Sequence, residues 1–288
     1  MGLPISPTLL YVAAFVFGAC IGSFLNVVVY RLPNDLSIVS PGSHCPACSR
    51  PIPAWLNVPI LSWIVLRGRC HFCAAPISIR YPLIELVTGL LWLASVRTFG
   101  WSWASVAAIV LSSALVAITF IDLDVWEIPD EISLPGIVVG GLLRPVAFGA
   151  PWWDGVIAAG VGAGALALLR WTFLRLRGVE GMGLGDVKLI AMIGAFVGLK
   201  GLLPVLLVSS VAGSTIGLLA MAAGPSTGAT KDPPSDPTDP NDPDDPDDWA
   251  PPDRAIPFGP FLTLGALFHL FFGPAFLRWF DGLPSRIV

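Results

Sequence analysis

Eight apolar segments alternate with polar segments along the 288 residues of the chain. They cover residues 9–30, 83–99, 101–121, 132–148, 152–174, 189–199, 202–223 and 258–280. A helix needs roughly 20 apolar residues to cross a bilayer, and most of the segments approach or exceed that length. The pattern therefore predicts an all-α polytopic membrane protein with about eight transmembrane helices. The seventh segment follows the short sixth one after a break at Lys200 and Gly201.

Two long polar segments divide this pattern into five parts. We expect a first transmembrane helix (1–30), a cytoplasmic cysteine-containing insertion (31–81) and a transmembrane core (82–223). An acidic linker (224–257) and a last helix with a C-terminal tail (258–288) follow. The linker holds nine aspartates between residues 232 and 253, many of them before proline, and almost no aliphatic side chains. Such a segment cannot bury a core, so we expect it to be disordered.

Composition agrees with the membrane assignment. Hydrophobic residues make up 55% of the chain and charged residues 12%, and the mean hydropathy is +0.76, whereas soluble domains are about a quarter charged. The net charge of −4 comes from the acidic linker. The sequence contains no basic stripe of the kind that would indicate a nucleic-acid partner. The first apolar segment has no positively charged residues before it, so we expect a retained helix rather than a removed signal peptide.

The polar insertion contains four cysteines in two CxxC pairs: Cys45, Cys48, Cys70 and Cys73. Two such pairs about twenty residues apart are typical of a zinc site, because each tight turn presents two thiolates to one tetrahedral ion. Sites made from four cysteines are structural. Two disulfides are the alternative, and they require an oxidising compartment. His44 and His71 flank the cysteines as alternative ligands.

Arginines indicate which face of the membrane these loops occupy. Five lie in or beside the insertion: Arg31, Arg50, Arg67, Arg69 and Arg80. Three more lie near or just after the end of the 152–174 segment: Arg170, Arg175 and Arg177. Because cytoplasmic loops are enriched in Lys and Arg, we expect both regions, and the turns that contain Asp122 and Asp186, to lie at the cytoplasmic face.

Asp122 and Asp186 are the candidate catalytic residues. Asp122 ends the 101–121 segment, and Asp186 follows three glycines at alternate positions, of which Gly183 and Gly185 are the nearest. Ionisable groups at membrane depth are costly and usually functional. Two carboxylates in one site share a proton, so one can activate water while the other polarises a carbonyl. The pair predicts a membrane aspartic protease.

Four further polar residues are candidate supporting groups: Glu85, Asp124, Asp130 and Lys188. Asp124 and Asp130 have the alternative role of capping or solvating a turn. Glu85 lies near the start of a helix, where the helix dipole favours a carboxylate; its alternative is a polar contact near the active centre. The glycines before Asp186 also suggest a phosphate or S-adenosylmethionine loop, but that fingerprint needs a preceding strand, and helices flank these glycines.

The residues resemble the bacterial type IV prepilin peptidases, membrane aspartic proteases of the GxGD class. The matching segments are residues 22–33, the two CxxC pairs, residues 80–86, Asp122 with residues 128–130, residues 183–188 and residues 256–260. They follow the family order over nearly the whole chain. The acidic linker before Ile256 is the departure from the family pattern.

The resemblance implies an enzyme of the bacterial cytoplasmic membrane in which Asp122 and Asp186 are the catalytic pair. Its substrates would be prepilins or pseudopilins of type IV pili or type II secretion. Cleavage would follow the glycine that ends a short basic leader, on the cytoplasmic side. The resemblance also implies a zinc domain and N-methylation of the new terminal residue by S-adenosylmethionine.

Two other function classes fit parts of the pattern. A membrane scaffold would use the zinc module as a docking surface and would tolerate Asp186→Asn. A transporter would use intramembrane acids for proton coupling, but it should show internal symmetry with paired broken helices, and the two halves of this sequence show none.

Overall fold

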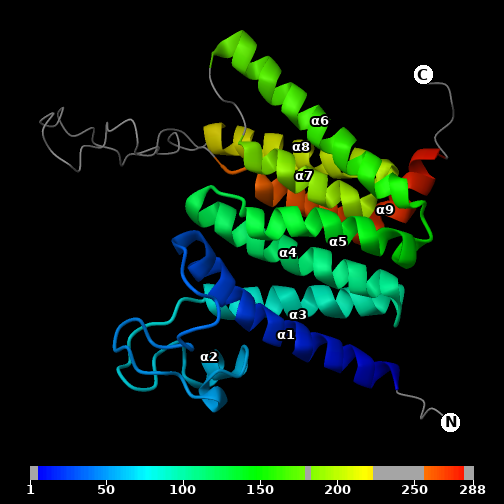
Figure 1. The fold of residues 1–288 in the computed structure, drawn as a ribbon. Helices are drawn as coiled ribbons and strands as arrows, with labels where there is room; N and C mark the ends of the chain where they lie inside the picture. Colours follow the sequence, from blue (N-terminus) through cyan, green and yellow to red (C-terminus); the bar gives the residue numbers. More distant parts are fainter. Residues whose placement is uncertain (1–5, 179–182, 223–255, 282–288) are drawn as a thin grey trace, which may run out of the picture.

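The computed structural model describes residues 6–178, 183–222 and 256–281, and its regular elements are all helical (Figure 1). The helices are α1 (Pro7–Arg31), α2 (Leu61–Val65), α3 (Arg80–Phe99), α4 (Trp103–Val125), α5 (Asp130–Phe148), α6 (Trp152–Arg177), α7 (Leu184–Val197), α8 (Leu199–Ala222) and α9 (Gly259–Asp281). Short 3-10 turns cover Leu32–Asn34 and Ala54–Leu56. The acidic linker lies outside the described residues up to residue 255, so its predicted disorder stays a prediction.

Seven of the described helices are long and apolar enough to cross a membrane. The all-α membrane class predicted from the sequence is confirmed. The remaining predicted span is α7, which has 14 residues and is therefore about 21 Å long, shorter than the hydrocarbon core of a bilayer. From Leu189 to Val197 every residue of α7 is buried. This short helix is the centre of the bundle, packed against α4, α5, α6, α8 and α9.

Small residues let α1 approach α3 closely. A side-chain carbon at Gly22 would lie 2.6 Å from the Cα of Glu85, and one at Gly18 would lie 2.8 Å from the side chain of Trp92. Contacts this short exclude any larger residue, and small residues are the usual means of close helix packing in membranes. The α1–α3 pair carries the polar insertion, so its packing fixes the insertion against the bundle.

A partly buried ion pair lies at the far end of α7. Arg144 of α5 pairs with Asp154 of α6 at 2.5 Å, and its guanidinium donates to the backbone oxygen of Phe196 at 2.7 Å. Gly198, with φ +73°, separates α7 from α8 at this point, and a side-chain carbon there would collide with both partners of the ion pair. The chain therefore breaks at Gly198, before the predicted break at Lys200 and Gly201.

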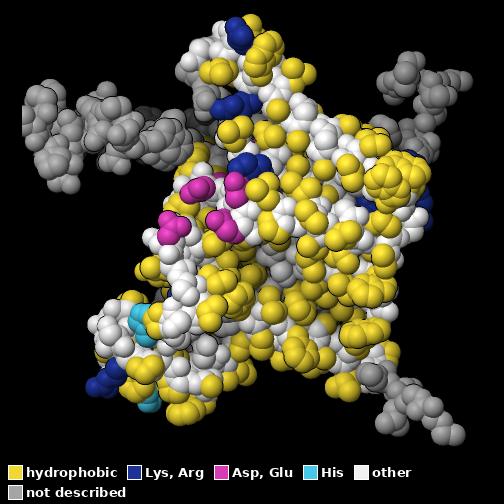
Figure 2. Space-filling view, viewed as in Figure 1, with side chains coloured by type: hydrophobic (Ala, Val, Ile, Leu, Met, Phe, Trp, Pro, Cys, Tyr) yellow, Lys and Arg dark blue, Asp and Glu magenta, His cyan; other side chains and the backbone are white. Residues whose placement is uncertain are grey.

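The other end of the bundle collects the polar features. The insertion, the end of α4 and the starts of α5, α7 and α9 all lie there, on the left in Figure 1. Acidic side chains gather over the α4–α5 turn, next to basic side chains of α6, while apolar side chains cover most of the remaining face (Figure 2). The exposed acids of the turn are Asp124, Glu127, Asp130 and Glu131. The polar and ionisable groups that could carry out a reaction at the membrane surface therefore lie mainly at this end of the bundle.

Candidate active site and metal centre

Asp122 lies in the last turn of α4, where its side chain faces the bundle. The residue is 4% exposed, and its Oδ2 atom has no hydrogen-bond partner among the described residues. The backbone of Gly259, the first residue of α9, lies in direct contact with the carboxylate. A backbone N–H at a helix N-terminus favours a nearby negative charge. Asp122 thus combines burial, contact with a positive helix end and one buried oxygen that has no hydrogen-bond partner among the described residues.

Asp186 lies in the first turn of α7 and is 8% exposed. Gly185 explains how α7 brings it to α4: a side-chain carbon at position 185 would lie 2.9 Å from the Cβ of Ile128. Ile128 is buried in the α4–α5 turn. Because Gly185 has no side chain, the start of α7 can pack directly onto this turn.

The two carboxylates interact electrostatically across the α4–α7 contact. They are separated by more than 60 positions in the sequence, so only the folded bundle brings them together. Two buried carboxylates at one site cannot both be ionised easily, and such a pair titrates as a unit. The arrangement provides one proton donor and one proton acceptor, which is the requirement for acid–base hydrolysis without a covalent intermediate.

Gly259 is a site residue that motif reading did not single out. Residues 256–260 belong to the quoted resemblance, but nothing in their composition indicates contact with Asp122. The contact depends on α9 approaching α4, where the hydroxyl of Thr119 donates to that of Thr263 at 2.9 Å. An alanine at 259 would place its Cβ on the Asp122 carboxylate.

The glycines before Asp186 allow a matched test. Gly185→Ala should lower the rate of peptide cleavage by roughly 10- to 100-fold, because displacing a catalytic group by about 1 Å can cost about 100-fold. Gly183→Ala should cost much less. Gly183 is the N-cap of α7 with φ −70°, and a Cβ there would meet no described atom closer than 3.8 Å.

The measurement for this pair is the steady-state rate of leader removal at matched amounts of inserted protein. Equal losses in the two variants would contradict the packing explanation for Gly185.

The predicted supporting acids of the α4–α5 turn are held in ion pairs. Arg80, the first residue of α3, makes a two-pronged contact with Asp124 at 2.5 and 2.7 Å. Its guanidinium also donates to the Phe120 backbone oxygen at 2.9 Å. Lys188 of α7 contacts Asp130 of α5 at 2.6 Å. These pairs tie α3 to α4 and α5 to α7 around the two buried aspartates.

Glu85 makes its hydrogen bonds to the polar insertion and to α1. It is 8% exposed, and its Oε2 atom accepts the backbone N–H of Ile60 at 2.6 Å. Ser23 of α1 also contacts the carboxylate. The side chain therefore fixes the polar insertion to α1 and α3, and neither role considered from the sequence describes this contact.

The four cysteines of the insertion form a cluster in which all four sulfurs lie within 4.8 Å of one another. The sulfurs of Cys45 and Cys73 are 3.8 Å apart, which is far beyond a disulfide bond of about 2.05 Å. Two sulfurs bound at about 2.3 Å to one tetrahedral ion would be separated by roughly 3.8 Å. All four cysteines are unpaired, and the cluster could hold a metal ion.

The two CxxC turns share the same pattern of backbone hydrogen bonds. The N–H of Cys45 donates to the Arg50 oxygen at 3.0 Å, and that of Cys70 donates to the Ala75 oxygen at 2.8 Å. Backbone N–H groups of Cys73 and Phe72 lower the pKa of the Cys70 thiol to about 6, which favours a thiolate. The histidines considered as alternative ligands are not part of the four-sulfur cluster.

The fold and the site define a class: a multi-pass helical membrane protein with a buried aspartate pair beside a four-cysteine insertion. Comparison with known proteins identifies the family. Residues 16–99 match the bacterial peptidase A24 N-terminal domain, and residues 109–218 match the type IV leader peptidase family. The chain belongs to the type IV leader peptidase family.

Full-length relatives support this assignment. The chain is 39% identical to the prepilin leader peptidase/N-methyltransferase of Myxococcus xanthus, over 95% of this chain and 92% of the relative. It is 38% identical to the protein of that name from Aeromonas hydrophila, over 95% of this chain and 94% of the relative. The protein of that name from Neisseria gonorrhoeae is 38% identical over 73% of this chain and 82% of the relative. No solved structure gives a significant match. Family membership favours an enzyme over the scaffold and transporter hypotheses.

Proposed function

We propose that this chain removes the leader peptide of type IV prepilins or pseudopilins and then methylates the new terminal amine. The observation that carries the peptidase part is that Asp122 and Asp186 are both buried at the insertion-bearing end of the bundle, where they interact electrostatically. Full-length similarity to prepilin leader peptidase/N-methyltransferases supports both activities.

Asp122 and Asp186 share one proton in the proposed cleavage. The ionised member takes a proton from water, and the resulting hydroxide attacks the scissile carbonyl carbon. The protonated member donates to the carbonyl oxygen and stabilises the tetrahedral intermediate. When the carbon–nitrogen bond breaks, its electrons go to nitrogen, which receives a proton from the pair and leaves as the new amine.

The surrounding contacts support these roles. The start of α9 presents backbone to Asp122, and the α4–α5 turn holds Gly185 close enough to keep Asp186 beside it. Ion pairs of Arg80 and Lys188 fix the helices around the pair without occupying it. These residues position the acids, whereas the acids carry the chemistry.

Zinc is the metal that the four-cysteine cluster suits best, since four thiolates in a tetrahedral arrangement are typical of structural zinc. Cys45, Cys48, Cys70 and Cys73 would hold it. The ion would supply no chemistry to cleavage and would connect two turns that otherwise share few buried side chains.

We assign the insertion and the aspartate pair to the cytoplasmic face. The arginines of the insertion and of the end of α6 support this orientation by the positive-inside rule. A leader that is short and basic would reach the exposed acids of the α4–α5 turn from that side.

Purified chain in lipid nanodiscs, incubated with a prepilin and S-adenosylmethionine, tests the proposal. Mass spectrometry should find a product that begins after the leader glycine and carries one added methyl group. An uncut prepilin, with the enzyme folded and metal-loaded, would refute the peptidase assignment. A cut but unmethylated product would restrict the function to cleavage.

A further inference from the structure

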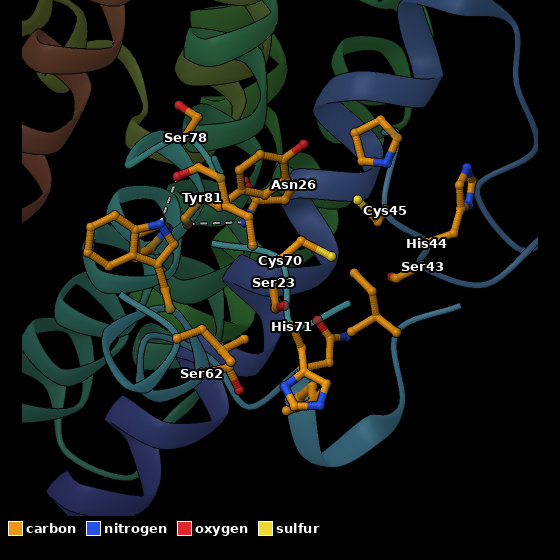
Figure 3. Close-up of a pocket in the computed structure, with 18 of the residues that line it drawn as sticks. Ser23, Asn26, Ser43, His44, Cys45, Ser62, Cys70, His71, Ser78 and Tyr81 are labelled. Carbon is orange, nitrogen blue, oxygen red and sulfur yellow. Dashed lines mark hydrogen bonds between the residues drawn. The ribbon is translucent and has the colours of Figure 1, made fainter. Parts of the chain in front are cut away.

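A large pocket separates the cysteine insertion from α1 and α3. Its volume is about 490 Å³, within the range of about 300–1,000 Å³ that small-molecule sites occupy. Figure 3 shows that Asn26 and Tyr81 come together from α1 and α3, with Ser23 and Cys70 close by. Cys45 and Cys70 belong to the pocket wall, so the metal cluster supports one side of the pocket.

A strained backbone turn forms another part of this wall. Ile60 has φ +63° and ψ −50°, and the N–H of Leu61 donates to the oxygen of Pro59 at 2.6 Å. This is a γ-turn with positive φ, which is rare and costly for a β-branched residue. Strain of this kind persists only where the surroundings impose it, and it is often found at ligand sites. Here the Glu85 carboxylate imposes it by accepting the Ile60 N–H.

The charges of the wall favour a small ligand that carries both signs. Glu85 is the only acid among the described residues that line the pocket, and Arg31 is its one arginine. Arg31 is buried, and its guanidinium holds the backbone oxygens of Ser37 and Pro41 at 2.8 and 2.7 Å. A leader with several positive charges would need more than one acid, so it fits this pocket poorly.

Aromatic side chains supply flat surfaces for a nucleobase. Trp63, Phe72 and Tyr81 line the pocket. Trp63 is fixed in place, because its indole N–H donates to the Ile77 oxygen at 3.0 Å and its ring packs against Gly68. Asn26 uses its amide N–H₂ to hold Gly22 and Tyr81 backbone oxygens, which leaves its carbonyl oxygen as an acceptor.

We propose that this pocket binds S-adenosylmethionine, with its adenine against the aromatic wall and its cationic amino-acid arm near Glu85. The assignment rests on the proposed methyltransferase function. The wall offers a nucleobase surface, a single carboxylate for a sulfonium or ammonium group, and the positive charge of the buried Arg31. No single one of these features would identify the ligand, but together they match the parts of this molecule.

The pocket and the aspartate pair are mechanically connected. Arg80 lies in the sequence between pocket-wall residues Ser78 and Tyr81. Its guanidinium donates to the carboxylate of Asp124, which is two residues after Asp122. In the proposed sequence, the new amine made at the aspartates meets the donor at this same end of the bundle. Its lone pair would attack the methyl carbon, and the carbon–sulfur bond would break with its electrons going to sulfur. The donor leaves as a neutral thioether, and the methylated amine loses one proton to water.

Binding of S-adenosylhomocysteine to the full chain in nanodiscs, measured by calorimetry, tests the site. Glu85→Gln and Tyr81→Ala should each weaken binding roughly tenfold or more, since charge-assisted contacts and base stacking each contribute on that scale. Leader cleavage by Tyr81→Ala, measured on the same samples, should fall less than donor binding does. Asp35→Asn is the matched control, because Asp35 is exposed, does not line the pocket, and has φ +53°, which asparagine tolerates.

Ultraviolet cross-linking of radiolabelled S-adenosylmethionine gives an independent readout. Label should map to peptides from residues 23–31 or 43–85. If wild type methylates but both variants bind as it does, or the label maps elsewhere, the pocket assignment is wrong while the function stands. If wild type cleaves but neither binds nor methylates, the methyltransferase function and the pocket assignment both fail. If the Glu85→Gln protein contains no metal, its loss of donor binding does not report on the carboxylate. The binding measured for Tyr81→Ala then decides whether the pocket is the donor site.

Discussion

Replacing Asp122 or Asp186 with asparagine should reduce leader cleavage by roughly 10³- to 10⁴-fold. Both side chains are buried at one site, and the amide can neither accept a proton from water nor donate one with the strength of a carboxylic acid. A positioned acid or base commonly contributes up to about 10⁴-fold. Because the two carboxylates act as a unit, the double variant should lose little more than either single variant.

Asp130→Asn is the matched control for this experiment. Asp130 lies in the same region, but its side chain is 49% exposed and pairs with Lys188. Exposed ion pairs contribute about 0–1 kcal/mol, so its loss should change cleavage by less than about tenfold. The rate is measured on a prepilin in nanodiscs with matched insertion and metal content. Normal cleavage by both Asp122→Asn and Asp186→Asn would show that the aspartates are structural.

The sequence predicted the membrane helices well because hydropathy in a bilayer is a local property. A helix in lipid satisfies its own backbone hydrogen bonds, so an apolar segment of sufficient length predicts one almost by itself. The position of α7 in the bundle could not be predicted from hydropathy in this way. Its 14 residues are too short to span a bilayer alone, and its place at the bundle centre follows from five neighbouring helices.

The site residues divide in the same way. Asp122 and Asp186 could be proposed from the sequence because an acid at the end of an apolar segment is unusual. Gly259 and Arg80 could not, since their roles depend on which helix ends meet. Glu85 was noticed for its position, but its partner is the backbone of Ile60, which composition cannot reveal. Backbone partners leave no residue-type signal, so only the folded structure identifies them.

The placement of the groups suggests why one chain would combine two activities. Cleavage needs buried acids at the membrane surface, whereas methyl transfer needs a soluble cofactor from water. The aspartates sit between α4 and α7, and the pocket lies between α1, α3 and the insertion. Arg80 links the two, since it begins α3 and holds both Asp124 and the Phe120 backbone of α4. The pocket wall includes neither aspartate, so mutations at one site should affect mainly its own activity.

Removing the metal from the cysteine cluster should abolish methylation and donor binding but leave cleavage within roughly tenfold. Among residues 32–79, only Cys45, Gly68 and Cys70 are buried, so this insertion has almost no hydrophobic core of its own. Structural zinc contributes about 10–16 kcal/mol in small zinc peptides. Loss of the ion should therefore unfold the insertion and remove one wall of the pocket, while the aspartate pair depends on α4, α7 and α9 instead.

The variants Cys45→Ser and Cys70→Ser, and chelator-treated wild type, provide the test, with Cys20→Ser as the control because Cys20 lies outside the cluster. Zinc content, limited proteolysis of the insertion, methylation and cleavage are measured on the same samples. Protease cuts should appear within residues 32–79 as zinc is lost. A metal-free protein that keeps its insertion folded, or that loses all cleavage while its membrane helices stay intact, would contradict this separation. The second result would mean that Arg80 transmits the state of the insertion to Asp122.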